Sequence, residues 1–457
     1  MSVRRRPGTY VERVKNVRTM NDLPSTSIGG IIGEVVRGPI NEAVLLTSWT
    51  QFQDTFAKGI ANPFTIGEVA KAVFGFFQNG GTEVYVVRVA SNSIAKAQGE
   101  IEGLTISALE GGSWGNSLGI AITENEGVFT LKVSMQGLEV ETINKLTEEN
   151  FVEVVNETSA YVRVSGESVA TGTVSLQGGV EGSLTAPNYT NGLKCFDVIE
   201  DINMLAITGV TIEGVQEGLV EYCDARGNVF PIVDAPSNAT IEEVKDFKDK
   251  LSSFCGSIHY PEIEIVHPIT GKKEYVAPSG HLMGMFARTD ATRGIHKAPA
   301  GLEATLKGAV SVRRPLSETE IAILNDYEIN CIIPKKGSGI VSWGARLLKS
   351  DAERQFISDL RLDMFVEEAV KRGTEWAVFE PKDDQLFNSL TSQISGLMLN
   401  LWQQGKLLGS TPEEAFFVKC DKEINPDILS SELNIEVGYA KKKPAEFVVT
   451  RISHKQN

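Results

Sequence analysis

Apolar residues follow two patterns along the chain, and together these predict strands alternating with helices before residue 90 and again after residue 190. Short β-branched runs are typical of buried strands, whereas apolar residues at every third or fourth position are typical of helices. The predicted strands are 27–37, 43–46, 84–89, 204–208, 229–233, 263–266 and 416–420. The predicted helices are one that begins after Ser48, then 66–77, 215–222, 241–251, 354–371 and 386–408. This alternation predicts an α/β fold.

The segment 91–190 has a different pattern, with short apolar runs between turn residues. It holds 13 Glu, no Asp and four basic residues, and it is rich in Gly, Ser, Thr and Val. Regularly spaced short strands between turns are typical of an all-β unit. We therefore expect an acidic, mainly β domain inserted into the α/β part.

The C-terminal third contains the most regular helical pattern of the chain, at 386–408, which Gly409 ends. A second helix start follows, with Thr411 as N-cap, Pro412 at the first position and Glu414 completing a capping box. Before these helices, 334–344 is glycine-rich and predicts a connecting loop. The fold class we expect is a multidomain α/β protein whose α/β core is built from both chain ends and the middle segment.

Charge is distributed unevenly over the 457 residues. The net charge is −15, yet residues 1–18 carry +5 and residues 441–457 carry +4, which leaves −24 on the rest of the chain. An acidic body disfavours non-specific binding to nucleic acid. The two basic ends could touch an anionic partner or dock on the acidic body of another copy.

Composition argues against several classes of site. The five cysteines are odd in number, widely spaced and without a CxxC pair, and the five histidines form no HExxH motif. This pattern favours a reduced compartment and predicts no disulfide framework, no zinc site and no cofactor. No apolar run approaches eighteen residues and no apolar segment follows the basic start, so neither a transmembrane helix nor a secretory signal is expected.

Catalytic motifs are weak. Gly111–Gly115 matches G-x-S-x-G, but that motif needs a strand before the serine and a helix after it, and here a strand follows. Residues 337–339 lack the order of a phosphate-binding loop. Polar residues that follow apolar runs, or that lie near them, are Asp234, His281, Arg288, Asp290 and His296. We interpret Asp234 and the segment 286–290 as strand ends, and both histidines as packed or hydrogen-bonded residues rather than ligands.

Both basic ends carry β-prone segments, at 9–14 and 446–452. A strand without a partner is an aggregation hazard unless it pairs with something, and solvated tails seldom contain such apolar residues. We expect these arms to add strands to a sheet of another subunit. The expected inter-subunit residues are Thr9, Tyr10, Val11, Glu12, Arg13, Val14, Lys441, Lys442, Lys443, Phe447, Val448, Val449 and Arg451.

Many short motifs, in order, resemble the contractile tail sheath proteins of bacteriophages and of related injection machines such as R-type bacteriocins. These motifs run nearly from end to end: 7–12 (PGTYVE), 25–27, 33–39 (GEVVRGP), 76–81, 85–89 (YVVRV), 114–116 (WGN), 278–281, 287–290, 297–300, 343–346 (WGAR), 376–381 (WAVFEP) and 444–447. No single motif is decisive, but their number and order are specific.

The resemblance implies a structural protein, not an enzyme. Such subunits assemble as stacked hexameric rings around a tail tube, and terminal arms link neighbouring subunits. The implied partners are other copies, the tube protein, and baseplate and tail terminator proteins, with no nucleic acid and no membrane insertion. The implied location is a virion tail or bacteriocin particle assembled in the host bacterial cytoplasm.

The expected domains follow from this scheme. They are a linking arm (1–20), the first part of the α/β core (21–90), the inserted β domain (91–190), a middle α/β domain (191–333), a tube-proximal domain (334–440) and a second linking arm (441–457). The polar side of the 386–408 helix provides the candidate tube contacts: Gln393, Gln403, Gln404 and Lys406.

Two other functions remain open from the residues alone. One is an α/β enzyme whose basic arms drive ordinary oligomerisation, although the spacing supplies no catalytic constellation. The other is a nucleic-acid binder that uses the tails, although aromatic and basic residues are not interleaved there.

Overall fold

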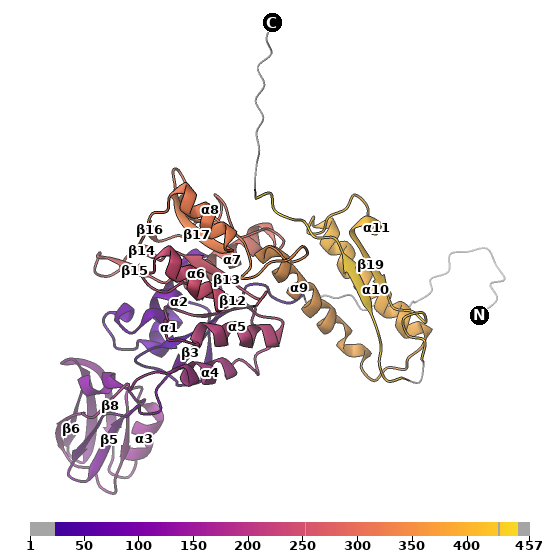
Figure 1. The fold of residues 1–457 in the computed structure, drawn as a ribbon. Helices are drawn as coiled ribbons and strands as arrows, with labels where there is room; N and C mark the ends of the chain where they lie inside the picture. The colour runs from indigo at the N-terminus through magenta and orange to yellow at the C-terminus, as the bar shows by residue number, and fades with distance from the viewer. Residues whose placement is uncertain (1–22, 252, 428–429, 447–457) are drawn as a thin grey trace, which may run out of the picture. The chain divides into compact units, whose positions relative to one another are not determined.

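The structure, a computed structural model, describes residues 23–251, 253–427 and 430–446, and the chain divides into two compact units (Figure 1). One unit runs from Ser25 to Arg361. The other comprises the described residues from Leu362 onward together with those before Ser25.

The larger unit is built on an eight-stranded sheet of order β18-β17-β13-β12-β11-β1-β3-β2. Its strands are β1 (Gly29–Glu34), β2 (Ala43–Leu46), β3 (Val84–Val89), β11 (Met204–Ile207), β12 (Phe230–Asp234), β13 (Ser257–Tyr260), β17 (Ile329–Lys335) and β18 (Gly339–Ser342). The six inner strands are parallel, and the edge strands β2 and β18 run antiparallel. All residues of β11 and β12 are buried, as expected for parallel strands covered on both faces.

Helices cover this sheet. They are α1 (Trp49–Phe56), α2 (Glu68–Asn79), α4 (Ala186–Lys194), α5 (Val215–Arg226), α6 (Ile241–Asp249), α7 (Ser279–Arg293) and α8 (Glu318–Asp326), with a 3₁₀ turn at Pro63–Thr65. Helices α5 and α6 connect β11 to β12 and β12 to β13, so right-handed crossovers place both on one face. Helices α2 and α7 pack closely because Gly280 lies against the backbone of α2; a Cβ at Gly280 would lie 2.3 Å from the carbonyl oxygen of Ala72.

The segment between β3 and α4 folds into two antiparallel sheets with a helix, visible as a separate lobe in Figure 1. One sheet consists of β4 (Gln98–Ile101), β5 (Leu104–Ala108) and β9 (Val162–Ser165). The other consists of β6 (Leu118–Asn125), β7 (Val128–Met135), β8 (Leu138–Leu146) and β10 (Gly172–Ser175). A 3₁₀ turn covers Ser113–Ser117, and α3 covers Phe151–Thr158. Its buried residues form a hydrophobic cluster that includes Trp114, Phe151 and Tyr161. The entering and leaving chains touch, since a Cβ at Gly182 would lie 2.6 Å from Ser91 Oγ.

A further three-stranded antiparallel sheet has the order β15-β14-β16. It consists of β14 (Ile263–Val266), β15 (Lys273–Val276) and β16 (Ala309–Val312). The strand predicted at 263–266 therefore forms, but it belongs to this small sheet rather than to the parallel one.

The smaller unit is helical with one hairpin-like pair of strands. Its elements are the part of α9 (Ile357–Thr374) from Leu362 onward, a 3₁₀ turn (Glu375–Ala377), α10 (Asp384–Gln403), α11 (Pro412–Ala415), β19 (Phe416–Lys419) and β20 (Glu436–Tyr439). Leu386, Phe387 and Leu390 of α10 pack with Cys420 in a small buried cluster.

The predicted α/β fold class is confirmed, and the helices and strands predicted before residue 90 form nearly as expected. The C-terminal end does not contribute to the α/β core as expected, because all eight strands of the main sheet lie between Gly29 and Ser342 and the residues from Leu362 onward form the smaller unit. Three local expectations are wrong. The glycine-rich segment 334–344 contains β18, so the expected boundary at 334 lies inside β17. The segment 286–290 lies within α7, whose buried residues cover several faces and hide its helical period. The carboxylate of Glu414 accepts from the Ser410 N–H at 2.8 Å instead of forming a capping box with Thr411.

Two buried histidines predict acid sensitivity. Burial lowers the pKa of His259 to about 3 and that of His281 to about 4, from an ordinary 6.5, whereas burial raises the pKa of Asp234 from 3.8 to about 6. Between pH 6 and 4 both histidines are protonated in the unfolded chain and largely neutral in the folded chain. Over the same range Asp234 is largely protonated in the folded chain and ionised in the unfolded chain. For these three groups together the unfolded state binds about one more proton than the folded state, so their contribution lowers the free energy of unfolding by about 1.4 kcal/mol per pH unit as pH falls.

Urea unfolding at a series of pH values measures this slope. In a His281→Asn variant the contribution of one histidine disappears, so the slope between pH 6 and 4 should fall by about 1.4 kcal/mol per pH unit. An unchanged slope in that variant would contradict the assignment to His281.

Candidate assembly site

The pair β19–β20 is a two-stranded antiparallel sheet with open edges. Phe416 pairs with Tyr439 and Lys419 with Glu436. Among the described residues the outer edge of β19 has no strand partner, and beside β20 there is only a bridge between Leu407 and Lys441, just beyond its end. Two strands alone are marginally stable, so this sheet has room for added strands and a physical reason to gain them.

Local sequence explains why this sheet forms where it does. Asp383 caps α10, because its carboxylate accepts from the Leu386 N–H at 2.8 Å. The helix then buries an apolar stripe against the rest of the unit, and β19 packs on it. On the open side, the ring of Phe417 is about half exposed and covers Gly438, where a Cβ would lie 2.2 Å from the ring. The sheet thus presents an aromatic side chain to solvent beside its free edges.

The base of the C-terminal arm is anchored within its own unit. Lys441 Nζ lies 2.8 Å from Asp363 Oδ2, and the Tyr439 hydroxyl donates to the other carboxylate oxygen of Asp363 at 2.5 Å. Lys442 donates to the carbonyl of Gly405 at 2.6 Å. Lys443 is exposed, and the other predicted arm residues lie outside the described residues: Thr9, Tyr10, Val11, Glu12, Arg13, Val14, Phe447, Val448, Val449 and Arg451. Lys441 and Lys442 therefore make intramolecular contacts at the point where this arm begins.

The predicted tube contacts separate into two groups. Gln393 is buried: it accepts from Trp376 Nε1 and donates to the Gly373 carbonyl, both at 2.8 Å. Its expected place on the polar side of the helix is wrong, because it lies on the same stripe as the buried Leu390 and Leu397. By contrast, Gln403 and Gln404 are exposed, and Lys406 is half-buried with its Nζ 5.7 Å from the centre of the Phe365 ring.

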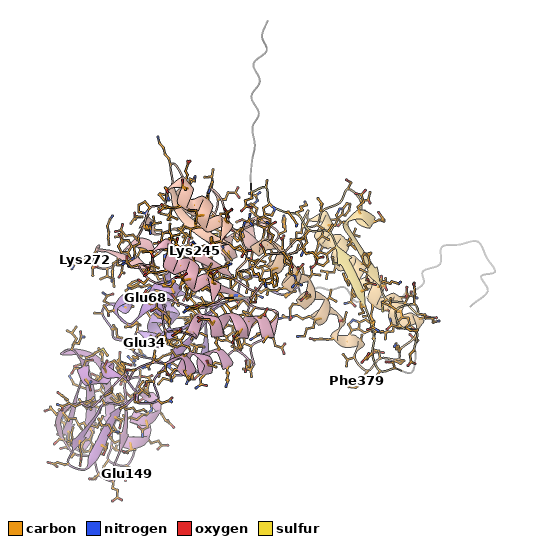
Figure 2. All side chains as sticks on the ribbon, in the orientation of Figure 1. Glu34, Glu68, Glu149, Lys245, Lys272 and Phe379 are labelled. Atoms are coloured by element: carbon orange, nitrogen blue, oxygen red, sulfur yellow. The ribbon has the colours of Figure 1, made fainter. Side chains whose placement is uncertain are left out.

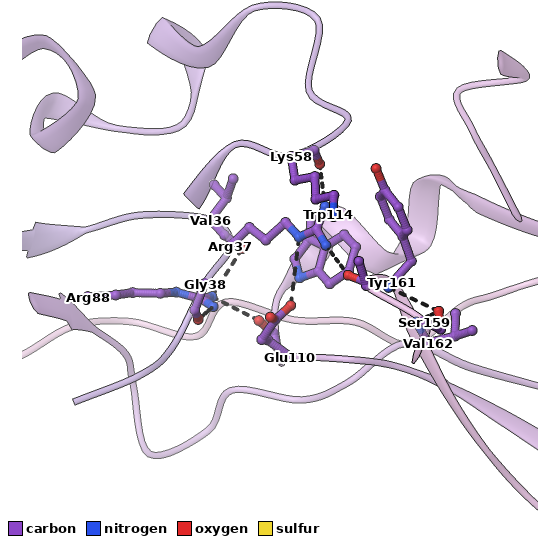
Figure 3. A network of polar contacts seen from close by, with 12 residues as sticks. Val36, Arg37, Gly38, Lys58, Arg88, Glu110, Trp114, Ser159, Tyr161 and Val162 are labelled. Atoms are coloured by element: carbon purple, nitrogen blue, oxygen red, sulfur yellow. Dashed lines mark hydrogen bonds and ion pairs between the residues drawn. The ribbon is translucent and has the colours of Figure 1, made fainter. Parts of the chain in front are cut away.

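A second feature is a buried arginine that joins the β insertion to the sheet (Figure 3). The Arg37 guanidinium lies between two rings, 4.5 Å from the centre of Trp114 and 4.4 Å from that of Tyr161. It also donates to the carbonyls of Lys58 and Ala160. Trp114, Tyr161 and Ala160 belong to the insertion, whereas Arg37 follows β1. Arg37 therefore links the insertion to the α/β part through hydrogen bonds and contacts with two aromatic rings.

A second arginine, Arg88 at the end of β3, completes this junction. It is fully buried and donates to the carbonyls of Gly38, Val36 and Gly111 at 2.9, 3.1 and 2.8 Å. Glu181, at 3.6 Å, provides a counter-charge. Burial lowers the pKa of Arg88, and the nearby carboxylates, Glu181 first, oppose this effect.

The two arginines also share an acidic neighbour. Burial raises the pKa of Glu110, while Arg37 and Arg88 act to lower it. Three motifs of the resemblance, GEVVRGP, YVVRV and WGN, thus meet at one place. The sequence carries one signal for this site, the charged Arg88 inside the otherwise apolar strand β3, which none of the catalytic or binding motifs includes.

The candidate catalytic residues have structural contacts. Ser113 precedes a strand, and its hydroxyl donates to Glu181 at 3.1 Å. Asp234 accepts from both the N–H and the hydroxyl of Ser279, and Asp290 forms a buried ion pair with Arg361 at 2.6 Å. In the described part of the chain no cluster of three or more His, Cys, Asp or Glu side chains could hold a metal ion. Within the same ranges no helix is long and apolar enough to span a bilayer.

Two curated proteins resemble this chain. One, from Pseudomonas aeruginosa, is named a putative prophage major tail sheath protein and is 28% identical over 215 residues. That match covers 46% of this chain and 52% of the relative, so the chain matches about half the length of that protein. The other, from Burkholderia phage BcepMu, is named a tail sheath protein and is 22% identical over 95% of this chain and 94% of its own length. No protein-family model matches the chain.

Solved structures share the fold over nearly the whole chain. The sheath tail protein of Desulfitobacterium hafniense superposes with a TM-score of 0.71 at 13% identity, covering 95% of this chain and all of that one. A chain from an extracellular contractile injection system, the PVC sheath complex in the contracted state, gives 0.65 at 18% identity, covering 100% and 99%. A chain from the anti-feeding prophage baseplate gives 0.63 at 19% identity, covering 99% and 100%. This chain therefore resembles tail sheath proteins in sequence and has their fold.

Proposed function

We propose that this chain is the structural subunit of a contractile tail sheath. It polymerises as stacked hexameric rings around a tail tube and contracts from a metastable extended state to drive the tube through a cell envelope. The named relatives and the fold support the sheath assignment. The chain acts through its packing against other copies rather than through catalysis.

The observation that carries the proposal is the open two-stranded sheet β19–β20. Its free edges lie in the same chain as two β-prone basic arms, at 9–14 and 446–452. An arm that adds a strand supplies backbone hydrogen bonds that do not depend on side-chain packing. Neighbours linked in this way stay attached while the contacts between their bodies change.

Contraction then needs no nucleotide hydrolysis. Two packings of the same subunits differ in free energy, and a trigger releases the less stable one. Since each subunit contributes to this free-energy difference, a small stabilisation per subunit adds up along the assembly. The neighbour from a contracted sheath complex supports a subunit that exists in such a state.

The expected domains have roles in this scheme. Residues 1–20 and 441–457 are linking arms, 91–190 project outward, and the smaller unit from Leu362 onward lies nearest the tube, with Gln403, Gln404 and Lys406 as the remaining candidate contacts. The partners are other copies, the tube protein, a baseplate and a tail terminator. The particle is a phage tail or a bacteriocin, assembled in the bacterial cytoplasm.

Negative-stain electron microscopy of the purified protein, over a concentration and salt series, tests this proposal. We expect striated hollow tubes or rings, formed alone or after addition of purified tail tube. Discrete small particles under every condition, with and without the tube, would contradict it.

A further inference from the structure

The β17–β18 hairpin carries a basic and aromatic surface, here called the hairpin patch and made of Leu302, Lys335, Lys336 and Trp343. Residues 329–350 contain four basic residues and no acidic one, in a chain with 59 acidic and 44 basic residues. This stretch therefore differs in sign from most of the molecule.

The hairpin patch has the composition of an interface centre. Trp343 is 39% exposed and Leu302 is 58% exposed. The two are brought together because the Gly301 N–H donates to the Ser342 carbonyl at 2.9 Å. Lys335 Nζ lies 3.9 Å from the centre of the Trp343 ring. Exposed tryptophan beside a cation is typical of residues that dominate binding energy.

The charges of the patch are free to meet a partner. Lys336 is exposed and forms no ion pair within the described residues, and Lys335 rests on an aromatic ring instead of a carboxylate. A partner for this surface must offer carboxylates. The β17–β18 hairpin itself contains no acidic residue.

A surface with those carboxylates lies on the outer side of α5 and α6, which share one face of the sheet. Four exposed acidic residues without an ion pair in the described ranges form this acidic face: Glu221, Asp224, Asp246 and Asp249. The cations nearby already have partners. Lys245, labelled in Figure 2, belongs to α6. It pairs with Glu242 at 2.9 Å, and its Nζ lies over the Tyr327 ring. Lys250 pairs with Glu213 at 3.4 Å.

We propose that the hairpin patch of one copy docks on the acidic face of a second copy. This inference rests on the proposed self-assembly and names two surfaces of the larger unit that meet in it. The contact joins different surfaces, so each copy keeps one free patch and one free face. Such head-to-tail contacts repeat into rings or helices, whereas a contact between identical surfaces stops at a dimer.

Paired charge reversals test the docking. One variant is Lys335→Glu/Lys336→Glu and the other is Asp246→Lys/Asp249→Lys. Each places like charges across the contact, so sedimentation velocity should show self-association weakened about tenfold or more. In a mixture of the two variants both contacts between unlike copies are complementary, so alternating assembly is restored, and a chain carrying all four changes restores every contact.

Two further variants make the test specific. Lys194→Glu/Lys272→Glu makes the same charge change at two exposed lysines outside the patch and should leave self-association within about twofold of wild type. Trp343→Ala removes the aromatic centre without changing charge and should weaken self-association as well. Circular dichroism of each variant checks that it is folded.

The outcomes separate this inference from the proposed function. Wild-type self-association that the patch reversals leave unchanged, or that the mixture fails to restore, overturns the docking alone. Absence of wild-type self-association under every condition overturns both. Loss of oligonucleotide binding in Lys335→Glu/Lys336→Glu, with self-association intact, would reassign the patch to nucleic acid.

Discussion

Deleting residues 1–15 should leave a folded chain that forms no tubes or rings. The deletion removes the six-residue segment 9–14, whose pairing would add about six backbone hydrogen bonds to an open sheet edge of a neighbour. At about 1 kcal/mol for each net hydrogen bond, the loss is about 6 kcal/mol per contact. This is about four orders of magnitude in the association constant. Electron microscopy and sedimentation velocity measure the result, and normal tubes from the deleted chain would refute the role of the arm.

A matched control keeps the length and the net charge of the arm, because the replaced segment contains one acidic and one basic residue, Glu12 and Arg13. Replacing residues 9–14 by a glycine-serine sequence removes β propensity and apolar side chains but leaves Arg4, Arg5 and Arg6 in place. If strand addition links the subunits, this variant fails as the deletion does. If it assembles normally, the charges of the arm are sufficient and the strand is not required.

Replacing Arg88 by alanine should lower the free energy of unfolding of the larger unit by about 3–5 kcal/mol. The change leaves three buried carbonyl oxygens and the Glu181 carboxylate without their donor, and removing one partner of a buried charged network is costly for that reason. It also opens a cavity where a fully buried side chain stood. Urea unfolding, followed by the fluorescence of Trp114 and the other tryptophans, measures this loss.

Two variants control for general effects. Arg88→Lys keeps the charge but has a single nitrogen in place of the forked guanidinium, so an intermediate loss is expected. Lys132→Ala removes an ion pair with Glu139 in which both side chains are about half exposed, and it should leave stability unchanged. A loss in Arg88→Ala as small as that in Lys132→Ala would show that the junction does not depend on this arginine.

The sequence alone was sufficient for the elements whose signals are local. The helix predicted to begin after Ser48 forms as α1, and Ser48 caps it because its hydroxyl accepts from the Gln51 N–H three residues away. The strands β2 and β3 were predicted with the observed bounds, since their apolar, β-prone runs are visible within one short segment. The start of α10 was predicted within two residues from its apolar stripe, but the helix ends at Gln403, so the expectation that Gly409 ends it is wrong. The likeness to tail sheath proteins was also available from ordered motifs and is confirmed by the comparisons.

Elements that are buried on more than one side gave weaker signals. Helix α7 has nine buried residues in its first nine positions, so no polar face marks its period, and its end was mistaken for a strand. Gln393 was placed on the polar side because it is polar, although its hydrogen bonds with Trp376 and Gly373 satisfy it inside the unit. In both cases burial by distant segments overrode the local pattern.

Only the tertiary structure decided which segments meet. Arg88 donates to carbonyls 50 and 23 residues away, and Arg37 reaches one 123 residues away. Strand 263–266 was predicted from its β-branched residues, but its pairing with β15 and β16 rather than with the parallel sheet depends on register and topology. Propensity, periodicity and caps act over a few residues, so the sequence by itself determined the elements and the family resemblance. The junction, the open edges of β19–β20 and the faces available to other copies depend on contacts between segments far apart in the chain, which only the folded structure specifies.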